Sequence, residues 1–155
     1  MLCKTKLPTP QNRKSDRKPV GMQPCLSCNM CPYVINTKEI TSSITRETYI
    51  NTNLFNCMTS GVIYLITCNK CNKQYVGESE RFLKKRASEH IGYIKKNTEA
   101  TGVHFNLPGH SLGNMCIQII EKVIPNTKEY RLLREEYWIK KLKTQEPNGM
   151  NKNVG

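Results

Sequence analysis

The sequence has no long apolar run and few aromatic residues. No stretch reaches the roughly 18 consecutive apolar residues that a membrane-spanning helix needs, and aromatic residues make up only 7% of the chain, with one Trp. Residues 1–6 carry charges but no apolar stretch after them, so the sequence predicts no secretory signal peptide. We therefore expect an intracellular protein that is neither secreted nor inserted in a membrane.

Acidic residues are scarce as well. The chain of 155 residues has 12 Asp and Glu against 24 Lys and Arg, a formal net charge of +12. An excess of that sign favours a polyanion, so nucleic acid is the expected partner, with a merely solvated basic surface as the alternative. Only 37% of the residues are hydrophobic, which suggests one modest domain plus a tail or long loops.

The composition divides the chain into three parts. Residues 1–20 combine prolines with a cluster of Lys and Arg and have almost no large apolar residues, which predicts a disordered basic arm. That arm could contact phosphates, carry a nuclear address or be a linker. Residues 21–58 form a Cys-rich N-terminal extension, with a short hairpin expected over residues 39–50. Residues 59–155 form the main domain.

Hydrophobic periodicity in the main domain predicts the order β-β-α-β-α. A buried strand (residues 61–67), a turn (68–73) and a second strand (74–77) come first. A helix capped by Ser79 (79–96) and a long loop (98–114) follow. A third strand (115–124) and a helix capped by Asn126 or Thr127 (126–143) close the domain. The first helix should have a core stripe at helical spacing, made of Leu83, Ala87, Ile91 and Ile94. This order suits a small α/β fold, an α+β sandwich in which helices flank a three-stranded antiparallel sheet.

Eight cysteines are many for a chain without a secretory signal. In a reducing compartment, Cys-x-x-Cys pairs point to zinc rather than to disulfides. Cys68 and Cys71 supply two thiolates at zinc-knuckle spacing, and His104 and His110 are the candidates for the other two ligands of a tetrahedral Zn²⁺ site. The long separation argues for a clamp that ties the 98–114 loop to the strand turn, and against a finger that reads DNA. Two free thiols and two loop histidines are the alternative.

A second zinc site could form from the other grouped cysteines, which are Cys25, Cys28, Cys31 and Cys57. Three close cysteines allow alternative ligand sets. Four thiolates would hold the extension against the main domain. Cys3 and Cys116 have no partner in these patterns, and Cys116 lies in an apolar run that predicts a core residue.

Two short motifs surround the first cysteine pair. Residues 61–64 read Gly-Val-Ile-Tyr and residues 75–78 read Tyr-Val-Gly-Glu, so each predicted strand presents a tyrosine. Over residues 61–151 this arrangement resembles the GIY-YIG nuclease superfamily, with Val in place of the family's central Ile. The cysteine pair, the Tyr-Trp-Ile segment at residues 137–139 and the closing Asn151 are most similar to the endonuclease domain of Penelope-like retroelements.

Arg86 and His90 stand four residues apart on the first predicted helix, so they share one face. The resemblance implies that Arg86 holds the scissile phosphate and that His90 assists proton transfer. The planar fork of arginine suits the first role, because it can pair with two phosphate oxygens at once. The alternatives are that Arg86 is one cation of a basic run, and that the neighbouring Lys85 takes its place.

Glu135 lies within an apolar stripe of the last predicted helix, while Glu136 is turned away. The apolar residues of that stripe are Leu132, Trp138, Ile139 and Leu142. A carboxylate in that position is costly unless it is paired or binds a cation. A salt bridge is one interpretation. The other is a single Mg²⁺ or Mn²⁺, since hard cations take oxygen ligands and keep several waters, and the resemblance also places a metal-binding glutamate here.

The resemblance further implies hydrolysis of a DNA phosphodiester bond, a nick, with one divalent metal ion. Tyr64, helped by His90, would accept a proton from the attacking water, and Tyr75 would position the phosphate or a water. Asn151 would support the site by hydrogen bonding. A tyrosine with an ordinary pKa of about 10 needs a nearby cation before it can act as a base, and ordinary strand tyrosines are the alternative.

Two other functions fit part of the pattern. A catalytically inactive, zinc-stabilised nucleic-acid-binding module explains the charge, the cysteines and the histidines, but not Glu135 together with Arg86 and the two tyrosines. A zinc-ribbon module for protein contacts does not need the net charge of +12. In a retroelement the nick would prime reverse transcription, so the resemblance also implies retroelement RNA or a reverse transcriptase as partners, and a nuclear location.

Overall fold

The computed structural model describes residue 3 and residues 19–152, so almost all of the predicted basic arm lies outside the described residues. The elements in chain order are β1 (Gly21–Met22), the 3-10 helix η2 (Cys31–Tyr33), β2 (Glu39–Thr41), β3 (Thr48–Ile50), β4 (Leu54–Phe55), β5 (Val62–Cys68), β6 (Gln74–Ser79), α1 (Leu83–Lys96), α2 (Glu99–His104), the 3-10 helix η3 (Leu112–Asn114), β7 (Met115–Lys122) and α3 (Lys128–Leu142). None of the helices in the described ranges has the length and apolar character to cross a membrane.

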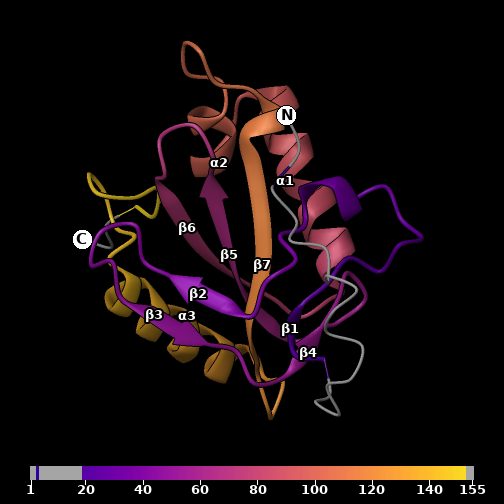
Figure 1. The fold of residues 1–155 in the computed structure, drawn as a ribbon. Coiled ribbons are helices and arrows are strands. Elements are labelled where there is room, and N and C mark those ends of the chain that lie inside the picture. The colour runs from indigo at the N-terminus through magenta and orange to yellow at the C-terminus, as the bar shows by residue number, and fades with distance from the viewer. Residues whose placement is uncertain (1–2, 4–18, 153–155) are drawn as a thin grey trace, which may run out of the picture.

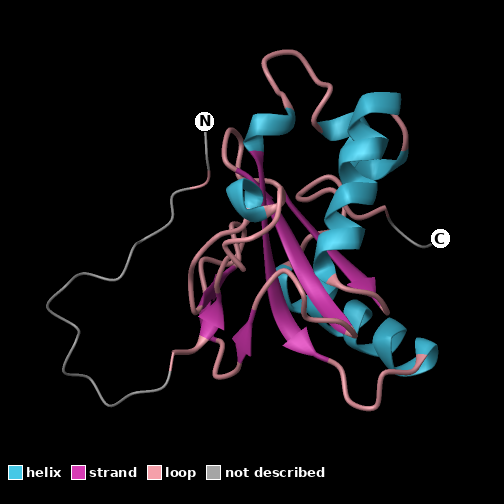
Figure 2. Cartoon of the chain, turned by 90° about the vertical axis from the view of Figure 1, so that its right-hand side faces the viewer, coloured by secondary structure: helices cyan, strands magenta, loops and turns pink. Residues whose placement is uncertain are grey.

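The main sheet has three antiparallel strands in the order β6-β5-β7, as the sequence predicts. The strands run through the middle of the molecule, and the helices lie against them (Figure 1 and Figure 2). β5 is the central strand and is covered on both faces, which explains why its residues form an almost continuous apolar run. Tyr64 of β5 pairs with Gly77 of β6 on one side and with Ile119 of β7 on the other.

Two hydrophobic cores lie on opposite faces of this sheet, because successive side chains of a strand point to opposite faces. Val62, Tyr64 and Ile66 of β5 pack with α1 and with the Cys-rich segment. Ile63 and Leu65 pack with α3 and with the β2–β3 hairpin. Since β6 is an edge strand, groups from α1 on one face and from α3 on the other can meet at its rim.

The Cys-rich extension joins the main domain through short strands and hydrogen bonds. β2 and β3 form the antiparallel hairpin expected over residues 39–50. β1 and β4 pair in parallel, which sets the start of the extension beside the segment that leads into β5. Asn51 Nδ2 donates to the Ile119 carbonyl at 3.1 Å, and Ser42 Oγ donates to the Leu142 carbonyl at 2.7 Å. The hairpin is therefore anchored to β7 and to the end of α3.

α1 begins later than the sequence predicts. Ser79, the predicted cap, is the last residue of β6, and its hydroxyl bonds the backbone of Arg81. The N-cap position is held by Phe82, whose side chain makes no capping hydrogen bond. The predicted core stripe of this helix is confirmed: Leu83, Ala87 and Ile94 are buried, and Ile91 is partly buried.

The loop expected over residues 98–114 contains a short helix, α2, and the 3-10 helix η3. α2 packs closely on α1 because Gly102 has no side chain: a Cβ there would lie 2.4 Å from the Tyr93 carbonyl oxygen. Helix α2 is too short to show the 3.6-residue repeat clearly. The last helix agrees with the sequence, since the Thr127 hydroxyl accepts a hydrogen bond from the Tyr130 amide at the start of α3.

Cys3 and Cys116 form a disulfide, although the sequence patterns gave neither of them a partner. Cys116 is buried in β7, as predicted for a core residue. The two cysteines are 113 positions apart, and no spacing pattern links cysteines over such a distance. Only the fold brings them together, and the bond ties residue 3 to the main sheet.

Candidate active site and metal centres

Four side chains from β5, α1 and α2 form one hydrogen-bonded row. Arg86 Nε donates to the Tyr64 hydroxyl at 2.9 Å, and that hydroxyl lies 2.7 Å from His90 Nε2. His90 Nδ1 lies 2.6 Å from Thr101 Oγ1. Tyr64, His90 and Thr101 are buried, whereas Arg86 is half-buried. The structure thus brings together three residues that the sequence predicted. It adds Thr101, which was not predicted because residues 98–114 were expected to form a loop.

One arrangement of the protons gives the Tyr64 hydroxyl and both ring nitrogens of His90 a partner. The Arg86 guanidinium can only donate, so the Tyr64 oxygen accepts from it and turns its own proton toward His90 Nε2. His90 then carries its proton on Nδ1 and donates to Thr101. Burial lowers the pKa of His90 to about 3, with the charge of Arg86 acting in the same direction, so this imidazole is neutral at physiological pH.

Tyr64 keeps its proton as well. Burial raises the pKa of Tyr64 well above its ordinary value, Tyr75 adds to that effect, and Arg86 opposes it. The nearby cation that a tyrosine base requires is therefore present, but burial outweighs it. Tyr64 has no exposed surface, so a water molecule must enter the site before it can reach this hydroxyl.

Gly77 of the second motif makes room for the tyrosine of the first. A Cβ at position 77 would lie 2.3 Å from both Cζ and Oη of Tyr64. Real Cβ atoms do not approach other atoms so closely, so any larger residue would displace the Tyr64 ring. The two motifs therefore fit together across the β5–β6 pair, where Tyr64 and Gly77 are direct partners.

Three side chains hold Arg86 and leave one of its donor groups without a partner among the described residues. Besides the bond to Tyr64, its Nη1 donates to Glu89 Oε1 at 3.2 Å and to the Tyr93 hydroxyl at 3.1 Å. Within the described part of the chain, Nη2 of Arg86 makes no hydrogen bond. The neighbouring Lys85 is exposed. Sequence reasoning missed Glu89 and Tyr93, although both stand at helical spacing, i+3 and i+7, from Arg86.

A cavity of about 200 Å³ opens beside this row. Its lining includes Tyr75, Arg86, His90, Tyr93 and Asn151. Tyr75 and His90 lie with their ring centroids 5.6 Å apart. Burial raises the pKa of Tyr75 above its ordinary value, against the effect of the Arg86 charge. The lining also includes Lys152 and Glu99, so the cavity presents two cations and one carboxylate beside the hydroxyl and imidazole groups.

Glu135 is half-buried on α3 and forms no ion pair in the described part of the chain. Burial raises the pKa of Glu135 to about 7, the charge of Glu78 adds to this, and Lys128 and Arg86 oppose it. The predicted apolar stripe is wrong at Leu132, which is 45% exposed, because Arg131 takes the buried position instead. Trp138 and Leu142 are buried as expected, and Glu136 is exposed and pairs with Lys140.

Glu78, which ends the second motif, is neutralised by two cations. Arg131 Nε donates to Glu78 Oε2 at 2.7 Å, and Lys128 Nζ donates to Oε1 at 2.9 Å. Although burial disfavours its charge, these partners hold the pKa of Glu78 below its ordinary value. Glu78 is therefore charge-compensated, whereas Glu135 has no ion-pair partner in the described ranges.

Asn151 closes the edge of β6. Its Oδ1 accepts from the Val76 amide at 2.8 Å, and its Nδ2 donates to the Val76 carbonyl at 2.9 Å. Thr144 Oγ1 also donates to Oδ1, at 2.7 Å. The side-chain amide thus makes the two hydrogen bonds with β6 that the backbone of a neighbouring strand would make. It holds the segment after α3 next to Tyr75.

Cys68, Cys71, His104 and His110 bring their ligand atoms within 4.8 Å of one another. Cys71 Sγ lies 3.4 Å from His104 Nε2. His110 Nδ1 faces the Pro108 carbonyl at 3.2 Å, while His110 Nε2 is buried without a hydrogen-bond partner. A buried ring nitrogen with no partner, whose opposite nitrogen is oriented by a carbonyl, is the arrangement that a metal-binding histidine requires. These residues could hold zinc.

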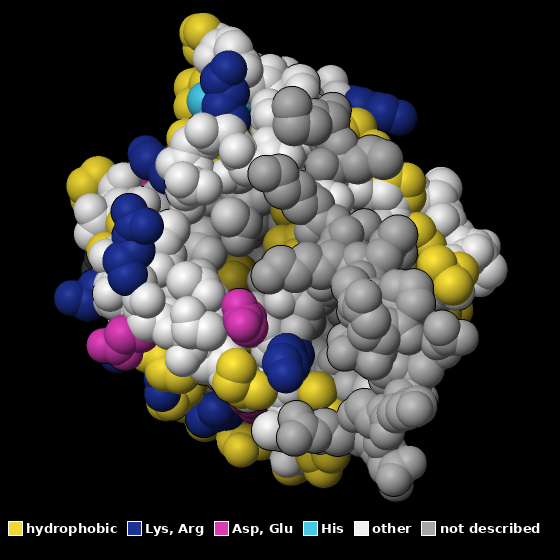
Figure 3. Space-filling model, viewed as in Figure 1, with side chains coloured by type: hydrophobic (Ala, Val, Ile, Leu, Met, Phe, Trp, Pro, Cys, Tyr) yellow, Lys and Arg dark blue, Asp and Glu magenta, His cyan; other side chains and the backbone are white. Residues whose placement is uncertain are grey.

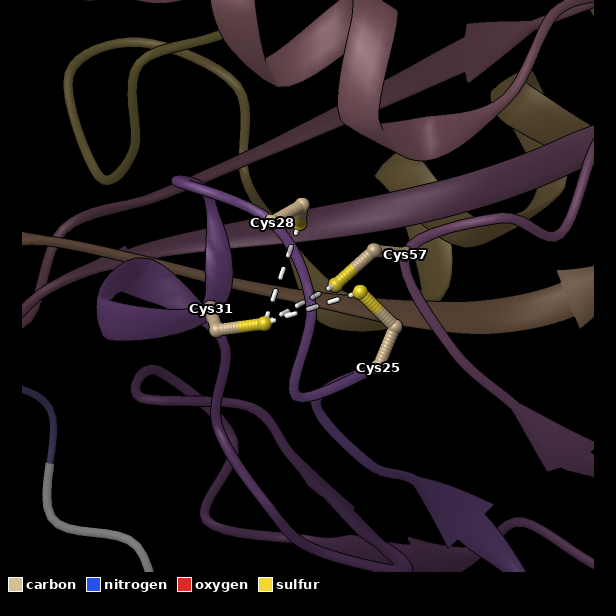
Figure 4. A group of neighbouring side chains, drawn as sticks. All are labelled: Cys25, Cys28, Cys31 and Cys57. Carbon is tan, nitrogen blue, oxygen red and sulfur yellow. Dashed lines mark hydrogen bonds between the residues drawn. The ribbon is translucent and has the colours of Figure 1, made fainter.

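Cys25, Cys28, Cys31 and Cys57 form a second group whose sulfur atoms lie within 4.8 Å of one another. Figure 4 shows the four side chains turned toward a common point. They lie where the extension packs against the core on the α1 face of the sheet. This group could also hold a metal ion.

The surface carries the positive charge that the composition predicts. In Figure 3, Lys and Arg side chains lie mainly over the left and lower parts of the coloured surface, with a few acidic side chains between them. A wider hollow of about 390 Å³ lies between the β2–β3 hairpin and the turn after β5, and none of the candidate catalytic residues lines it.

A family model described as the GIY-YIG catalytic domain matches residues 60–151. The catalytic domain of the homing endonuclease I-TevI is similar in structure, with 30% sequence identity and a TM-score of 0.51, over 60% of this chain and 98% of that one. A mutant of the catalytic domain of the intron endonuclease I-TevI matches with 29% identity and a TM-score of 0.48, over 60% and 96% of the two chains. No curated protein matches. The matched residues contain every candidate catalytic residue, while the Cys-rich extension lies before them.

Proposed function

The chain belongs to the GIY-YIG family, and we propose that it is a DNA endonuclease that nicks one strand with the help of one divalent metal ion. The observation that carries the proposal is the convergence of Tyr75, Arg86 and His90 on one cavity, where Nη2 of Arg86 has no hydrogen-bond partner among the described residues. The net charge of +12 favours a polyanionic substrate.

Arg86 is the proposed phosphate-binding residue. Tyr64, Glu89 and Tyr93 fix its guanidinium before any substrate arrives, so little reorganisation remains when a phosphate oxygen approaches Nη2. A guanidinium is also the side chain best suited to the charge that builds on a phosphate during transfer. Tyr75 lines the same cavity and would orient the phosphate or the attacking water.

Glu135 is the proposed ligand of Mg²⁺ or Mn²⁺. The fit rests on its surroundings: a half-buried carboxylate without a counter-ion, near Arg86 and β6, is an oxygen donor that a hard cation would stabilise. A bound divalent cation would neutralise charge on the phosphate and on the leaving 3′ oxygen. Glu78 is already paired with Arg131 and Lys128, so it is not the proposed ligand.

Tyr64 and His90 are proposed to move the proton of the attacking water. A free tyrosinate is disfavoured by burial, so Tyr64 could accept that proton only as it passes its own to His90. The contact of 2.7 Å between the Tyr64 hydroxyl and His90 Nε2 offers this route. Because burial lowers the pKa of His90 to about 3, the imidazole would hold the proton only briefly, until the leaving 3′ oxygen takes one up. Thr101 would hold the imidazole in the tautomer that the transfer needs.

Cys68, Cys71, His104 and His110 are the proposed ligands of a structural zinc ion. Cys68 ends β5, Cys71 lies in the turn that follows it, and His104 ends α2. A zinc ion here would tie α2, which carries Thr101, to the strands that carry the two tyrosines. The unpaired His110 Nε2 supports this assignment.

We further propose that the protein is a retroelement-derived module of the Penelope-like type, acting in the nucleus with retroelement RNA or a reverse transcriptase. The support is the resemblance in the cysteine pair between the motifs and the two later histidines. Hydrolysis with a leaving 3′ oxygen produces a 3′ hydroxyl and a 5′ phosphate. A nicked product that a DNA polymerase cannot extend would contradict a priming role.

The endonuclease proposal is tested by conversion of supercoiled plasmid to open circles in Mg²⁺ or Mn²⁺, with a metal-chelated reaction as the blank. Glu135→Gln should abolish nicking and Glu136→Gln should not, because Glu136 is exposed and paired with Lys140. Gel-shift binding of the same DNA should survive in both variants. DNA binding without nicking by the wild-type protein would favour the inactive nucleic-acid-binding module.

A further inference from the structure

Cys25, Cys28, Cys31 and Cys57 are spaced as the ligands of one tetrahedral ion. Cys31 Sγ lies 3.7 Å from Cys25 Sγ, 3.7 Å from Cys28 Sγ and 3.9 Å from Cys57 Sγ. These separations are far longer than the roughly 2.05 Å of a disulfide bond. A zinc–sulfur bond of about 2.3 Å in a regular tetrahedron gives sulfur separations of ~3.8 Å, which the three distances match.

The fold assembles this group from two distant segments. The β1–β4 pair sets residues 21–22 beside residues 54–55, and the first three cysteines and Cys57 follow those strands. Leu26 has a φ of +69°, which turns the chain between Cys25 and Cys28. The Leu26 amide donates to Cys31 Sγ at 3.2 Å. A backbone donor on a ligand sulfur is the kind of outer contact that supports a bound thiolate.

The same segment supplies the cap that α1 lacks. The first amides of a helix have no partner within the helix, and Phe82 at the N-cap offers no side-chain acceptor. The Lys84 amide instead donates to the Cys57 carbonyl at 2.8 Å, and the Leu83 amide donates to the Thr59 carbonyl at 3.0 Å. A candidate metal ligand therefore also holds the first turn of the helix that carries Arg86.

We propose that Cys25, Cys28, Cys31 and Cys57 bind one Zn²⁺ as four thiolates, and that this ion fixes the cap of α1 and thereby the position of Arg86. Four sulfur donors in a tetrahedron suit zinc. The ion would make the Cys-rich extension a structural part of the site rather than an appendage. This inference does not depend on DNA cleavage, because it is tested by metal content and amide exchange.

Metal content is measured first, on the full chain purified under reducing conditions. The wild-type protein should hold about two zinc ions, one in each cysteine group. Cys28→Ser should lose one of them. Cys68→Ser should lose the other, so that the zinc left in this variant belongs to the four-cysteine group. Replacing that zinc by Co²⁺ should give charge-transfer and visible bands of a site with four sulfur ligands.

The link to α1 is measured by amide hydrogen exchange. Cys28→Ser should lose protection at the Leu83 and Lys84 amides, while the interior of α3 stays protected. Cys68→Ser is the matched control, because it removes a thiolate of the other group and should leave these two amides protected.

Three results would overturn the proposal. Zinc content in Cys68→Ser that falls to zero would show that the four-cysteine group binds none. Disulfides mapped among the four cysteines in the reduced, native wild-type protein would do the same. Unchanged exchange at Leu83 and Lys84 in a folded, zinc-depleted Cys28→Ser protein would remove the link to α1. If Cys28→Ser does not fold, the zinc content and Co²⁺ spectrum of Cys68→Ser still decide the metal site.

Discussion

Arg86 Nε donates a hydrogen bond of 2.9 Å to the hydroxyl of Tyr64, a side chain with no exposed surface. The tyrosine of the first motif therefore does not face the cavity directly. It sets the direction of the guanidinium that does. Because the Tyr64 ring in turn rests against Gly77, the two motifs and the first helix form one positioned unit.

Replacing Gly77 with Ala should damage this unit. The added Cβ would lie 2.3 Å from Tyr64 Cζ, so the ring must shift and the bond to Arg86 must change. Overpacking of this kind typically costs about 1–3 kcal/mol, measurable by urea unfolding, and nicking should fall with it. Gly92→Ala is the control: nothing lies within 4 Å of its Cβ position in α1, and alanine there should stabilise by about 0.5–1 kcal/mol. Equal stability of both variants would contradict the packing argument.

His90 should make the protein less stable at acidic pH. Burial, helped by Arg86 and opposed by Glu89, holds its folded pKa at about 3, below the ordinary value of 6.5. Between these two pKa values the unfolded chain binds a proton on His90 and the folded protein does not. The contribution of the neutral imidazole to the free energy of unfolding is therefore complete above about pH 6.5 and is lost as pH falls toward about 3. The slope for one such group is at most about 1.4 kcal/mol per pH unit.

The measurement is urea unfolding of the wild-type protein and of His90→Asn at several pH values from about 7 down to about 4. The variant lacks the titrating imidazole, so its stability should fall less steeply over this range. Glu78, Glu89 and Glu135 titrate in both proteins and cancel in the difference. Parallel curves for the two proteins would contradict a buried, neutral His90.

Arg131 and Lys128 both pair with Glu78 but should contribute unequally. The Arg131 side chain is 5% exposed and the Lys128 side chain is 65% exposed. Arg131→Ala leaves Glu78 without its buried partner, and breaking a buried pair typically costs about 3–5 kcal/mol. Lys128→Ala removes a solvent-exposed partner, which is typically worth less than about 1 kcal/mol. Thermal unfolding of the two variants compares them, and an equal loss would contradict the buried role of Arg131.

The sequence was most informative where apolar periodicity is long. The three-stranded sheet, the stripe of α1 and the Thr127 cap of α3 follow from patterns within single elements. The start of α1 could not be predicted, because its cap comes from the Cys57 and Thr59 carbonyls, and backbone carbonyls leave no trace in a sequence.

Sequence patterns also missed contacts that only tertiary structure creates. Helical spacing placed Leu132 on the buried stripe, but the charge of Glu78 on β6 draws Arg131 inward and leaves Leu132 exposed. Thr101 was hidden in an expected loop. The Cys3–Cys116 disulfide joins residues that are distant in the chain. In each case the deciding partner lies on another element.

The central claim is that Arg86 holds the scissile phosphate, and the most direct measurement is the single-turnover nicking rate of Arg86→Ala beside Lys85→Ala. The two substitutions remove one positive charge each, from neighbouring positions on α1, so both should weaken DNA binding similarly. At saturating protein, Arg86→Ala should lose about 100-fold or more in rate, as expected for removing a group that stabilises transition-state charge, and Lys85→Ala should stay near the wild-type rate. Equal rates for the two variants, or a larger loss in Lys85→Ala, would contradict the account.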